Sequence, residues 1–278
     1  MLPLVSIVIP NYNNAVYLKD SLESVLAQDY PNKQVIVVDD GSTDDSLSVL
    51  ENYGKHIQTI KNSHAGASAA RNAGILAAEG ELIALMDSDD IWMPNKLTLQ
   101  VSHLQEGLFD LVYCGGLEFG RKEGDHTVYI PKFSGNCSVH FHDNPTSAVI
   151  ILGCSSAIFK KSLLPLTGIF DTTFQNASED WDFFRRYCDY ANVGFIAESL
   201  VHYRRHDNNM SSSSIHDYYD GNCKAVRKML LLGSDSNYLR NRKTWNKLQW
   251  SYIKTFMKTG DLFNSLKCTI RIFLPISL

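Results

Sequence analysis

Three aspartates, Asp87, Asp89 and Asp90, stand within four positions directly after the apolar run 82–86. Two carboxylates about 4 Å apart repel each other by roughly 4 kcal/mol at an effective dielectric constant near that of a protein surface. Water at an exposed turn, nearby cationic side chains or a bound cation would compensate for this repulsion. Mg²⁺ and Mn²⁺ prefer carboxylate oxygen, and one or two protein carboxylates suffice when substrate phosphates complete the shell. A calcium loop of the EF-hand type is excluded, because Trp92 stands where that loop requires glycine.

Two further polar clusters follow apolar segments in the same way. The β-branched run 4–9 ends at a loop of residues 10–14, and the run 34–38 ends at Asp39, Asp40 and Gly41. These runs and 82–86 have the composition of buried strands. Amphipathic or alanine-rich patterns between and after them predict helices over 16–28, 67–78 and 94–104, the last with Pro94 in its first turn.

Strands alternating with helices predict an α/β fold with a mostly parallel sheet flanked by helices on both faces. Ligands of such sheets bind at the carboxyl ends of the strands. The three polar clusters all lie at predicted strand ends, so we expect them to face one crevice.

The remaining segments complete this outline. Ser42 with Asp45 resembles a capping box, which predicts a helix to about Asn52. The other predicted elements are a strand at 57–61, strands at 110–116, 127–131 and 193–203, an extended stretch at 147–159, and helices at 160–164, 179–190 and, in several pieces, 218–272. We therefore expect a domain over 1–214, made of a nucleotide-type half (1–104) and an acceptor-type half (105–214), followed by a helical tail over 215–278.

Composition limits the function classes. The chain has 278 residues, is 44% hydrophobic and carries a net charge of −4, which argues against a general nucleic-acid binder. The six cysteines are scattered and form no CxxC pair, so they signal neither a zinc site nor a redox motif. The first residues lack the features of a signal peptide, and no apolar run approaches 18 residues. We therefore expect free thiols and a cytoplasmic location.

The charge is unevenly distributed. From Lys224 to the end there are 11 basic and 2 acidic residues, net +9, whereas the preceding residues are net −13. Aromatic and aliphatic side chains interleave with the basic ones in this tail, as in helices that lie at a membrane interface. A helical cap packed on the catalytic domain or an oligomer contact fits the same pattern. Peripheral contact with the inner face of the cell membrane is thus one of three possibilities that this pattern leaves open.

Residues 4 to about 210 resemble the inverting, metal-dependent family 2 glycosyltransferases of GT-A fold. The similarity lies in the order and spacing of six segments: VSIVIPNYN (5–13), VIVVDDGSTDDS (35–46), GASAARNAG (66–74), ALMDSDD (84–90), GIFD (168–171) and SEDWDFFRR (178–186).

The resemblance implies roles for the first segments in binding a nucleotide-sugar. Tyr12 would stack on the pyrimidine base, and Asp39 would accept a hydrogen bond from the ring N–H. Arg71 would lie near the diphosphate, which a guanidinium fork suits. The resemblance also implies that Pro10, Asn13 and Ser88 belong to this nucleotide-sugar site.

The resemblance also implies a metal and a base. Asp89 would bind Mn²⁺ or Mg²⁺ directly, Asp87 would contact the metal shell and the ribose, and His206 would contact the metal or a phosphate. Asp180 is favoured as the base that deprotonates the acceptor hydroxyl, with Glu179 and Asp182 as alternatives. Acidic residues at a helix start also interact favourably with the helix dipole, so this cluster alone would not identify a base.

Three smaller expectations complete the site. Asp90 would cap the helix that follows it, and Arg204 and Arg205 would meet the diphosphate. The segment from 202 through the serine run 211–214 would form a loop that closes over the donor.

The predicted function is transfer of a hexosyl or N-acetylhexosaminyl group from a UDP- or dTDP-sugar to a hydroxyl of a saccharide or lipid-linked acceptor, in cell-surface polysaccharide synthesis. A sugar nucleotidyltransferase would need a glycine-rich phosphate loop after the first strand, and residues 10–14 contain no glycine. A dinucleotide-dependent oxidoreductase would need the GxGxxG pattern, which is missing. A catalytically inactive nucleotide-sugar-binding protein would not need both acidic motifs.

Overall fold

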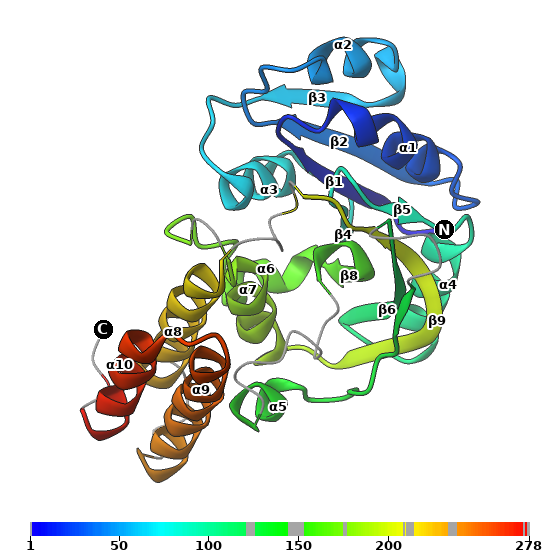
Figure 1. Cartoon of the computed structure of the whole chain (residues 1–278). Helices are drawn as coiled ribbons and strands as arrows, with labels where there is room; N and C mark the ends of the chain where they lie inside the picture. Colours follow the sequence, from blue (N-terminus) through cyan, green and yellow to red (C-terminus); the bar gives the residue numbers. More distant parts are fainter. Residues whose placement is uncertain are drawn as a thin grey trace.

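The computed structural model describes residues 2–120, 126–143, 153–174, 177–207, 209, 214–232, 238–274 and 276. The strands of this part form one nine-stranded sheet in the order β3-β2-β1-β4-β8-β6-β9-β5, with β7 paired to β6 (Figure 1). The strands are β1 (Val5–Asn11), β2 (Lys33–Asp39), β3 (Gln58–Lys61), β4 (Leu82–Leu85), β5 (Ile91–Trp92), β6 (Leu111–Phe119), β7 (Thr127–Tyr129), β8 (Ala157–Lys160) and β9 (Val193–Arg204).

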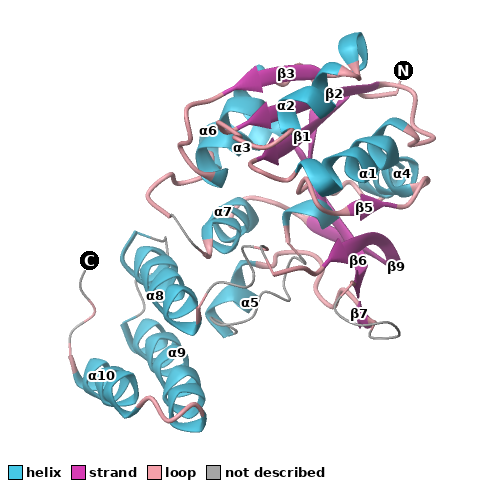
Figure 2. Ribbon diagram, turned by 45° about the horizontal axis from the view of Figure 1, so that its top comes forward, coloured by secondary structure: helices cyan, strands magenta, loops and turns pink. Residues whose placement is uncertain are grey.

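Helices cover both faces of the sheet and form the C-terminal region (Figure 2). The α-helices are α1 (Ala15–Leu26), α2 (Ser46–Glu51), α3 (Ala67–Ala77), α4 (Lys96–Glu106), α5 (Ser138–Asp143), α6 (Leu164–Thr167), α7 (Glu179–Cys188), α8 (Ile215–Leu232), α9 (Tyr238–Lys258) and α10 (Leu262–Phe273). Short 3-10 turns occur at Gly54–His56, Cys154–Ser156 and Lys161–Leu163.

The sheet changes character between its two halves. β3, β2, β1 and β4 pair in parallel, as predicted for the first 104 residues. β8 is antiparallel to both β4 and β6, and β6 returns to a parallel pairing with β9. The two-residue β5, which sequence patterns did not predict, pairs antiparallel with β9. The carboxyl ends of β1, β2 and β4 therefore lie together at one edge.

Alternating side chains of the central strands explain the two layers. Ile7 and Ile9 point toward the apolar cluster that contains α1, α2 and α4, whereas Val8 points toward the cluster that contains α3 and α7. A strand buried on both faces needs apolar residues at every position, and all of β1 is buried. This explains why the run 4–9 shows no alternation of polar and apolar residues.

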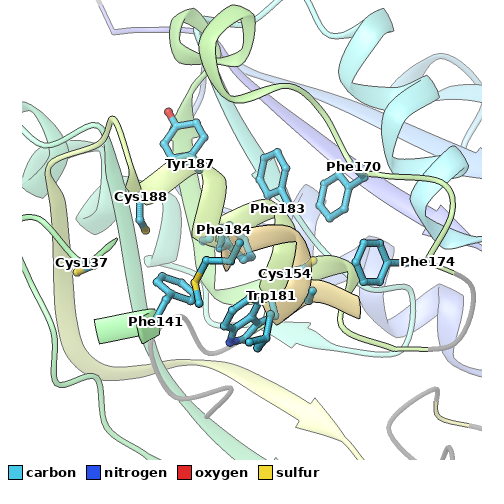
Figure 3. Packing of buried hydrophobic residues seen from close by; sticks show 14 of the residues in the cluster. Cys137, Phe141, Cys154, Phe170, Phe174, Trp181, Phe183, Phe184, Tyr187 and Cys188 are labelled. Atoms are coloured by element: carbon cyan, nitrogen blue, oxygen red, sulfur yellow. The ribbon is translucent and has the colours of Figure 1, made fainter. Parts of the chain in front are cut away.

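The acceptor half is built around α7. Phe183, Phe184 and Tyr187 of this helix are almost fully buried, and the Phe183 ring stacks on Phe170 with ring centroids 4.3 Å apart. Figure 3 shows these side chains together with Cys154, close to the start of α7. The aromatic run after Asp180 thus fixes the helix whose first turn carries the predicted base.

The three C-terminal helices extend this core. α8 packs on α7, α9 packs on α8 and α10 packs on α9, and side chains such as Trp245 and Phe256 belong to the same cluster as Phe183. Figures 1 and 2 place α9 and α10 at the opposite end of the molecule from α2 and β3. None of the helices in the described ranges combines the length and apolar character needed to span a membrane.

Two predicted helix starts are wrong. Helix α2 begins at Ser46 with Asp45 as its N-cap, so Ser42 does not cap it; the Ser42 hydroxyl bonds the Asp39 carboxylate instead. Helix α4 begins at Lys96 after Asn95, so Pro94 precedes the helix. Of the stretch 147–159 predicted to be extended, 147–152 lie outside the described residues, and the rest is a 3-10 turn followed by β8.

Candidate active site

The ends of β1 and β2 are joined by side-chain hydrogen bonds. Asp39 is 1% exposed and accepts hydrogen bonds from Asn11 Nδ2 at 2.9 Å and from the Ser42 hydroxyl at 2.6 Å, both at Oδ2. Its Oδ1 accepts a third hydrogen bond from the Ser42 backbone N–H at 3.0 Å. Three protein donors therefore hold this buried carboxylate in place.

The loop after β1 is held against its neighbours. Asn13 has a left-handed backbone, with φ 50°, and its Oδ1 accepts a hydrogen bond from the backbone N–H of Thr43 at 2.7 Å. Asn14 donates to the Ser88 hydroxyl at 3.0 Å. The polar clusters at the three strand ends are therefore in contact, as the sequence predicted. Asn13 and Ser88 bond protein partners, so they connect the loops at the strand ends to one another.

Tyr12 and His64 form an aromatic surface at this edge. Tyr12 is 44% exposed, and its ring centroid lies 4.2 Å from that of His64. Asp40 holds the segment that carries His64, because its carboxylate accepts from the backbone N–H of Ala65 at 2.9 Å and of Gly66 at 2.7 Å. Sequence reasoning missed His64, and the two residues that separate it from α3 gave no signal of it.

Asp90 is the buried carboxylate of the acidic turn and supports it from the protein interior. It is 4% exposed and accepts hydrogen bonds from the Ser155 hydroxyl at 2.5 Å and from the Arg204 backbone N–H at 3.2 Å. Burial and the neighbouring carboxylates Asp89 and Asp87 raise the pKa of Asp90 well above its usual value. Ser155 also accepts from the Asp87 backbone N–H at 3.0 Å. The prediction that Asp90 caps a helix is wrong, because its oxygens link the 3-10 turn before β8 and the last residue of β9 to the acidic turn.

Asp89 faces His206. The His206 Nε2 lies 3.1 Å from Asp89 Oδ2, and Asn209 Nδ2 donates to the same oxygen at 2.8 Å. The His206 ring stacks on Tyr17, with centroids 4.4 Å apart. Burial and the nearby Asp87 raise the pKa of Asp89, and His206 opposes that rise.

The donor set fits a hard divalent cation that shares its shell with a substrate. The His206 Nε2 lies beside Asp89, and Asp87 is near enough for its charge to raise the pKa of Asp89, so a cation bound at Asp89 would relieve the repulsion between the two carboxylates. Among the described residues, no three His, Cys, Asp or Glu side chains are grouped so as to hold a metal by themselves. The remaining ligands would therefore have to come from water or substrate.

Arg71 connects the two acidic motifs. Its side chain is 5% exposed; NH2 donates to Asp87 Oδ1 at 2.8 Å and NH1 donates to Glu179 Oε1 at 3.0 Å. Burial works against its charge, but Cys154, Asp87 and Glu179 together raise the pKa of Arg71 well above its ordinary value. Both ends of the fork are thus occupied by carboxylates, where the sequence predicted a diphosphate. The bond from Arg71 to Glu179 brings two residues that are 108 positions apart in the sequence into contact.

Asp180 differs from the carboxylates at the strand ends. It is partly exposed, and its Oδ1 accepts from the Trp181 backbone N–H at 2.7 Å. Burial and the adjacent Glu179 raise its pKa to about 6, with Arg71 opposing the rise. A carboxylate with that pKa is ionised at neutral pH and still basic enough to accept a proton.

Asp182 is engaged elsewhere. It is 1% exposed, and its Oδ2 bonds Arg186 Nε at 2.9 Å and Lys228 Nζ at 3.0 Å. Two cationic partners and burial remove it from contact with an acceptor, which leaves Asp180 and Glu179 as the carboxylates beside Arg71.

Helix α8 supports the start of α7. Ser178, which precedes Glu179, has a left-handed backbone with φ 70°, and its hydroxyl donates to Asn222 Oδ1 at 2.8 Å. Gly221 lies so close that a Cβ there would be 2.7 Å from the Ala177 carbonyl oxygen. The sequence gave no indication that the tail touches this turn.

The two arginines after β9 have protein partners. Arg204 donates from Nε to the Asp89 carbonyl at 3.0 Å and from NH2 to Asp20 at 2.9 Å. Arg205 pairs with Glu118. These contacts contrast with the predicted diphosphate partners. Residues 202–204 of the predicted closing loop belong to β9, and 208 and 210–213 lie outside the described residues.

Comparison with known proteins adds the family. The model of glycosyl transferase family 2 matches residues 6–164. An uncharacterized glycosyltransferase of Rickettsia typhi is 30% identical over 272 residues, which cover 91% of this chain and 83% of that protein. The UDP-Glc:alpha-D-GlcNAc-diphosphoundecaprenol beta-1,3-glucosyltransferase WfgD of Escherichia coli is 33% identical over 170 residues, 58% of this chain and 62% of WfgD.

A solved structure supports the fold. S. aureus TarS 1-349, in complex with UDP-GlcNAc, superposes with a TM-score of 0.68 at 17% identity and covers 95% of this chain and 90% of that one. The predicted GT-A-type fold with a helical C-terminal extension is therefore confirmed.

Proposed function

We infer the reaction from a premise that the comparisons establish: the chain belongs to glycosyl transferase family 2 and is a glycosyltransferase. We propose that it transfers a hexosyl or N-acetylhexosaminyl group, with inversion, from a UDP- or dTDP-sugar to an acceptor hydroxyl. The observation that carries this proposal is the Arg71 bridge, because it joins Asp87 of the acidic turn to Glu179, the residue next to the proposed base Asp180.

The nucleotide base binds at the ends of β1 and β2. An ionised carboxylate offers about four acceptor positions, and protein donors use three of those on Asp39. The fourth accepts the pyrimidine ring N–H, which purines lack at the matching position. The exposed Tyr12 ring supplies a stacking surface beside Pro10, and stacking of a base on an aromatic ring contributes about 1–3 kcal/mol.

Asp89, with Asp87 and His206 beside it, would hold a divalent cation, Mn²⁺ or Mg²⁺. When bound, the cation neutralises charge that develops on the leaving nucleoside diphosphate. Arg71 contributes indirectly, because it fixes the Asp87 carboxylate from the protein side and leaves the solvent side of Asp87 to the ligand shell.

Asp180 takes the proton of the acceptor hydroxyl as its oxygen forms a bond to the anomeric carbon and the bond to the diphosphate breaks. Attack from the side opposite the leaving group inverts the configuration at that carbon. The proton goes to a carboxylate whose pKa of about 6 suits neutral conditions.

The acceptor is a saccharide or lipid-linked saccharide of cell-surface polysaccharide synthesis. Support comes from WfgD, whose name specifies a UDP-glucose donor and a diphosphoundecaprenol-linked acceptor. The Asp180 side chain is partly exposed, which leaves it accessible to an acceptor from solvent.

A panel of UDP- and dTDP-sugars tests the proposal through release of the free nucleotide, with Mn²⁺ and with a chelator. We expect metal-dependent release from at least one pyrimidine nucleotide sugar. Binding of such donors without turnover, with any metal and with glycan acceptors present, would contradict the assignment of a reaction to this crevice.

A further inference from the structure

Helix α10 turns its large apolar side chains outward. Every position of α10 that is exposed to solvent carries an apolar side chain: Leu262, Phe263, Leu266, Ile270 and Phe273. Phe263 is 77% exposed and Phe273 is 79% exposed. The three buried positions of the helix are Ser265, Cys268 and Ile272. The usual polarity of a surface helix is therefore reversed, and contiguous exposed apolar side chains mark interaction sites.

The exposed side chains form one stripe. Phe263, Leu266, Ile270 and Phe273 are spaced by three, four and three residues, so they share one helix face. A helix of 12 residues is roughly 18 Å long. The stripe is too short to cross a bilayer and suits a helix that lies in the plane of a membrane interface.

The charge of this region defines the surface that it fits. Residues 238–274 contain eight basic side chains and one acidic side chain, Asp261, which gives a net charge of +7. α9 and α10 themselves contain no acidic residue. Exposed lysines of α9 are Lys243, Lys247, Lys254 and Lys258. A surface that is both apolar and this basic is complementary to anionic lipid.

We propose that the stripe Phe263, Leu266, Ile270 and Phe273 inserts into the interfacial layer of an anionic membrane and docks the enzyme there. Lys267 and Arg271 flank the stripe in the sequence of α10, and the lysines of α9 add to the attraction. This docking is independent of the catalytic proposal, because none of these residues touches the crevice.

A second copy of the chain fits less well. A twofold interface brings the same patch of both copies together, which would place two surfaces of net positive charge against each other. A lipid surface supplies the opposite charge and an apolar layer at once.

Co-sedimentation with vesicles tests the proposal in the full chain. One set contains phosphatidylcholine with about one third phosphatidylglycerol, and the other contains phosphatidylcholine alone. We expect the wild type to bind the anionic set, to bind less as salt rises, and to leave the neutral set unbound. The double substitution Phe263→Gln with Phe273→Gln should weaken binding to anionic vesicles on the order of tenfold or more, because each change removes a large apolar side chain from the lipid layer.

The matched control is Leu76→Gln with Leu166→Gln, which changes two exposed leucines, 74% and 61% exposed, on α3 and α6. It should bind as the wild type does. A second pair, Leu266→Gln with Ile270→Gln, should repeat the loss, and circular dichroism melting should show that every variant folds.

Wild-type affinity for anionic vesicles in both α10 variants would overturn the proposal, as would absence of wild-type binding. A wild type that is dimeric without vesicles, and that the α10 variants convert to monomer, would overturn it in favour of a second copy as the occupant.

Discussion

The carboxylates at the strand ends and the carboxylate at the start of α7 have the same chemistry and opposite surroundings. Asp39 receives three hydrogen bonds and Asp90 receives two, from Ser155 and Arg204, so protein groups hold both in place. Asp180 receives one and is partly exposed. The number of donors and the access to solvent separate a carboxylate that builds the site from one that accepts a proton.

The largest expected effect distinguishes two aspartates of the same helix turn. Asp180→Asn removes the proton acceptor while keeping the shape of the side chain, so nucleotide release in the presence of acceptor should fall on the order of a thousandfold. Asp182→Asn should leave the rate per folded molecule nearly unchanged and lower the melting temperature, because it weakens the pairs with Arg186 and Lys228. If Asp180→Asn and Asp182→Asn lost the same share of the rate, Asp180 would no longer be distinguished from Asp182 as the base.

Loss of Asp89 should act on binding. Asp89→Ala should weaken Mn²⁺-dependent donor binding by roughly a hundredfold, since the cation loses its directly bound carboxylate. Isothermal titration with UDP and Mn²⁺ measures this, and the same titration with a chelator gives the baseline. Asp90→Asn is the control, because its oxygens already bond Ser155 and Arg204. If Asp89→Ala bound UDP with unaltered metal-dependent affinity, the metal would have to bind elsewhere than at this turn.

Arg71 should affect both motifs at once. Arg71→Gln removes the cation between Asp87 and Glu179, and the rate should fall by about tenfold to a hundredfold. The acid limb of the pH profile should also move to higher pH, because Arg71 lowers the pKa of Asp180. Arg71→Lys keeps the charge and should keep the position of the limb. If the acid limb of the pH profile stayed at the wild-type pH in Arg71→Gln, the charge of Arg71 would not influence the pKa of Asp180.

The smallest expected effect concerns the support from α8. Gly221→Ala places a Cβ against the Ala177 carbonyl and should destabilise the fold by about 1–3 kcal/mol, although alanine by itself favours a helix by about 1 kcal/mol. Ser251→Ala on the exposed face of α9 changes helix propensity alone. Chemical denaturation compares the two. A stabilised Gly221→Ala variant would mean that α8 does not press on the turn before Glu179.

The parallel part of the sheet and its crevice were predictable, because they follow from local patterns. Strand composition, helix periodicity and the polar residues at strand ends are each encoded by a few neighbouring residues. In β1 and in the segment 82–90, the apolar strand and its polar end can be read directly from the sequence. The predicted meeting of three strand ends is realised in the bonds from Asn11 to Asp39 and from Asn14 to Ser88.

Long-range partners were not predictable from such patterns. Ser42 has the residue type and the spacing of a helix cap, yet its hydroxyl accepts from the Asn13 backbone N–H, 29 positions away in the sequence. Arg71 was expected near phosphate, and only the packing of α7 beside α3 supplies Glu179 as its partner. The contact of Gly221 with Ala177 depends on how α8 crosses α7, which no local signal encodes.

The pH dependence of kcat/KM, followed by nucleotide release from an accepted donor, tests the role of Asp180 most directly. The account predicts that kcat/KM rises with pH through a single acid limb near pH 6 and then levels, since the carboxylate must lose its proton to act as a base. In Asp180→Asn the limb should vanish along with most of the activity. A limb near pH 6 that persists in Asp180→Asn, with the rate intact, would contradict the claim that this carboxylate deprotonates the acceptor.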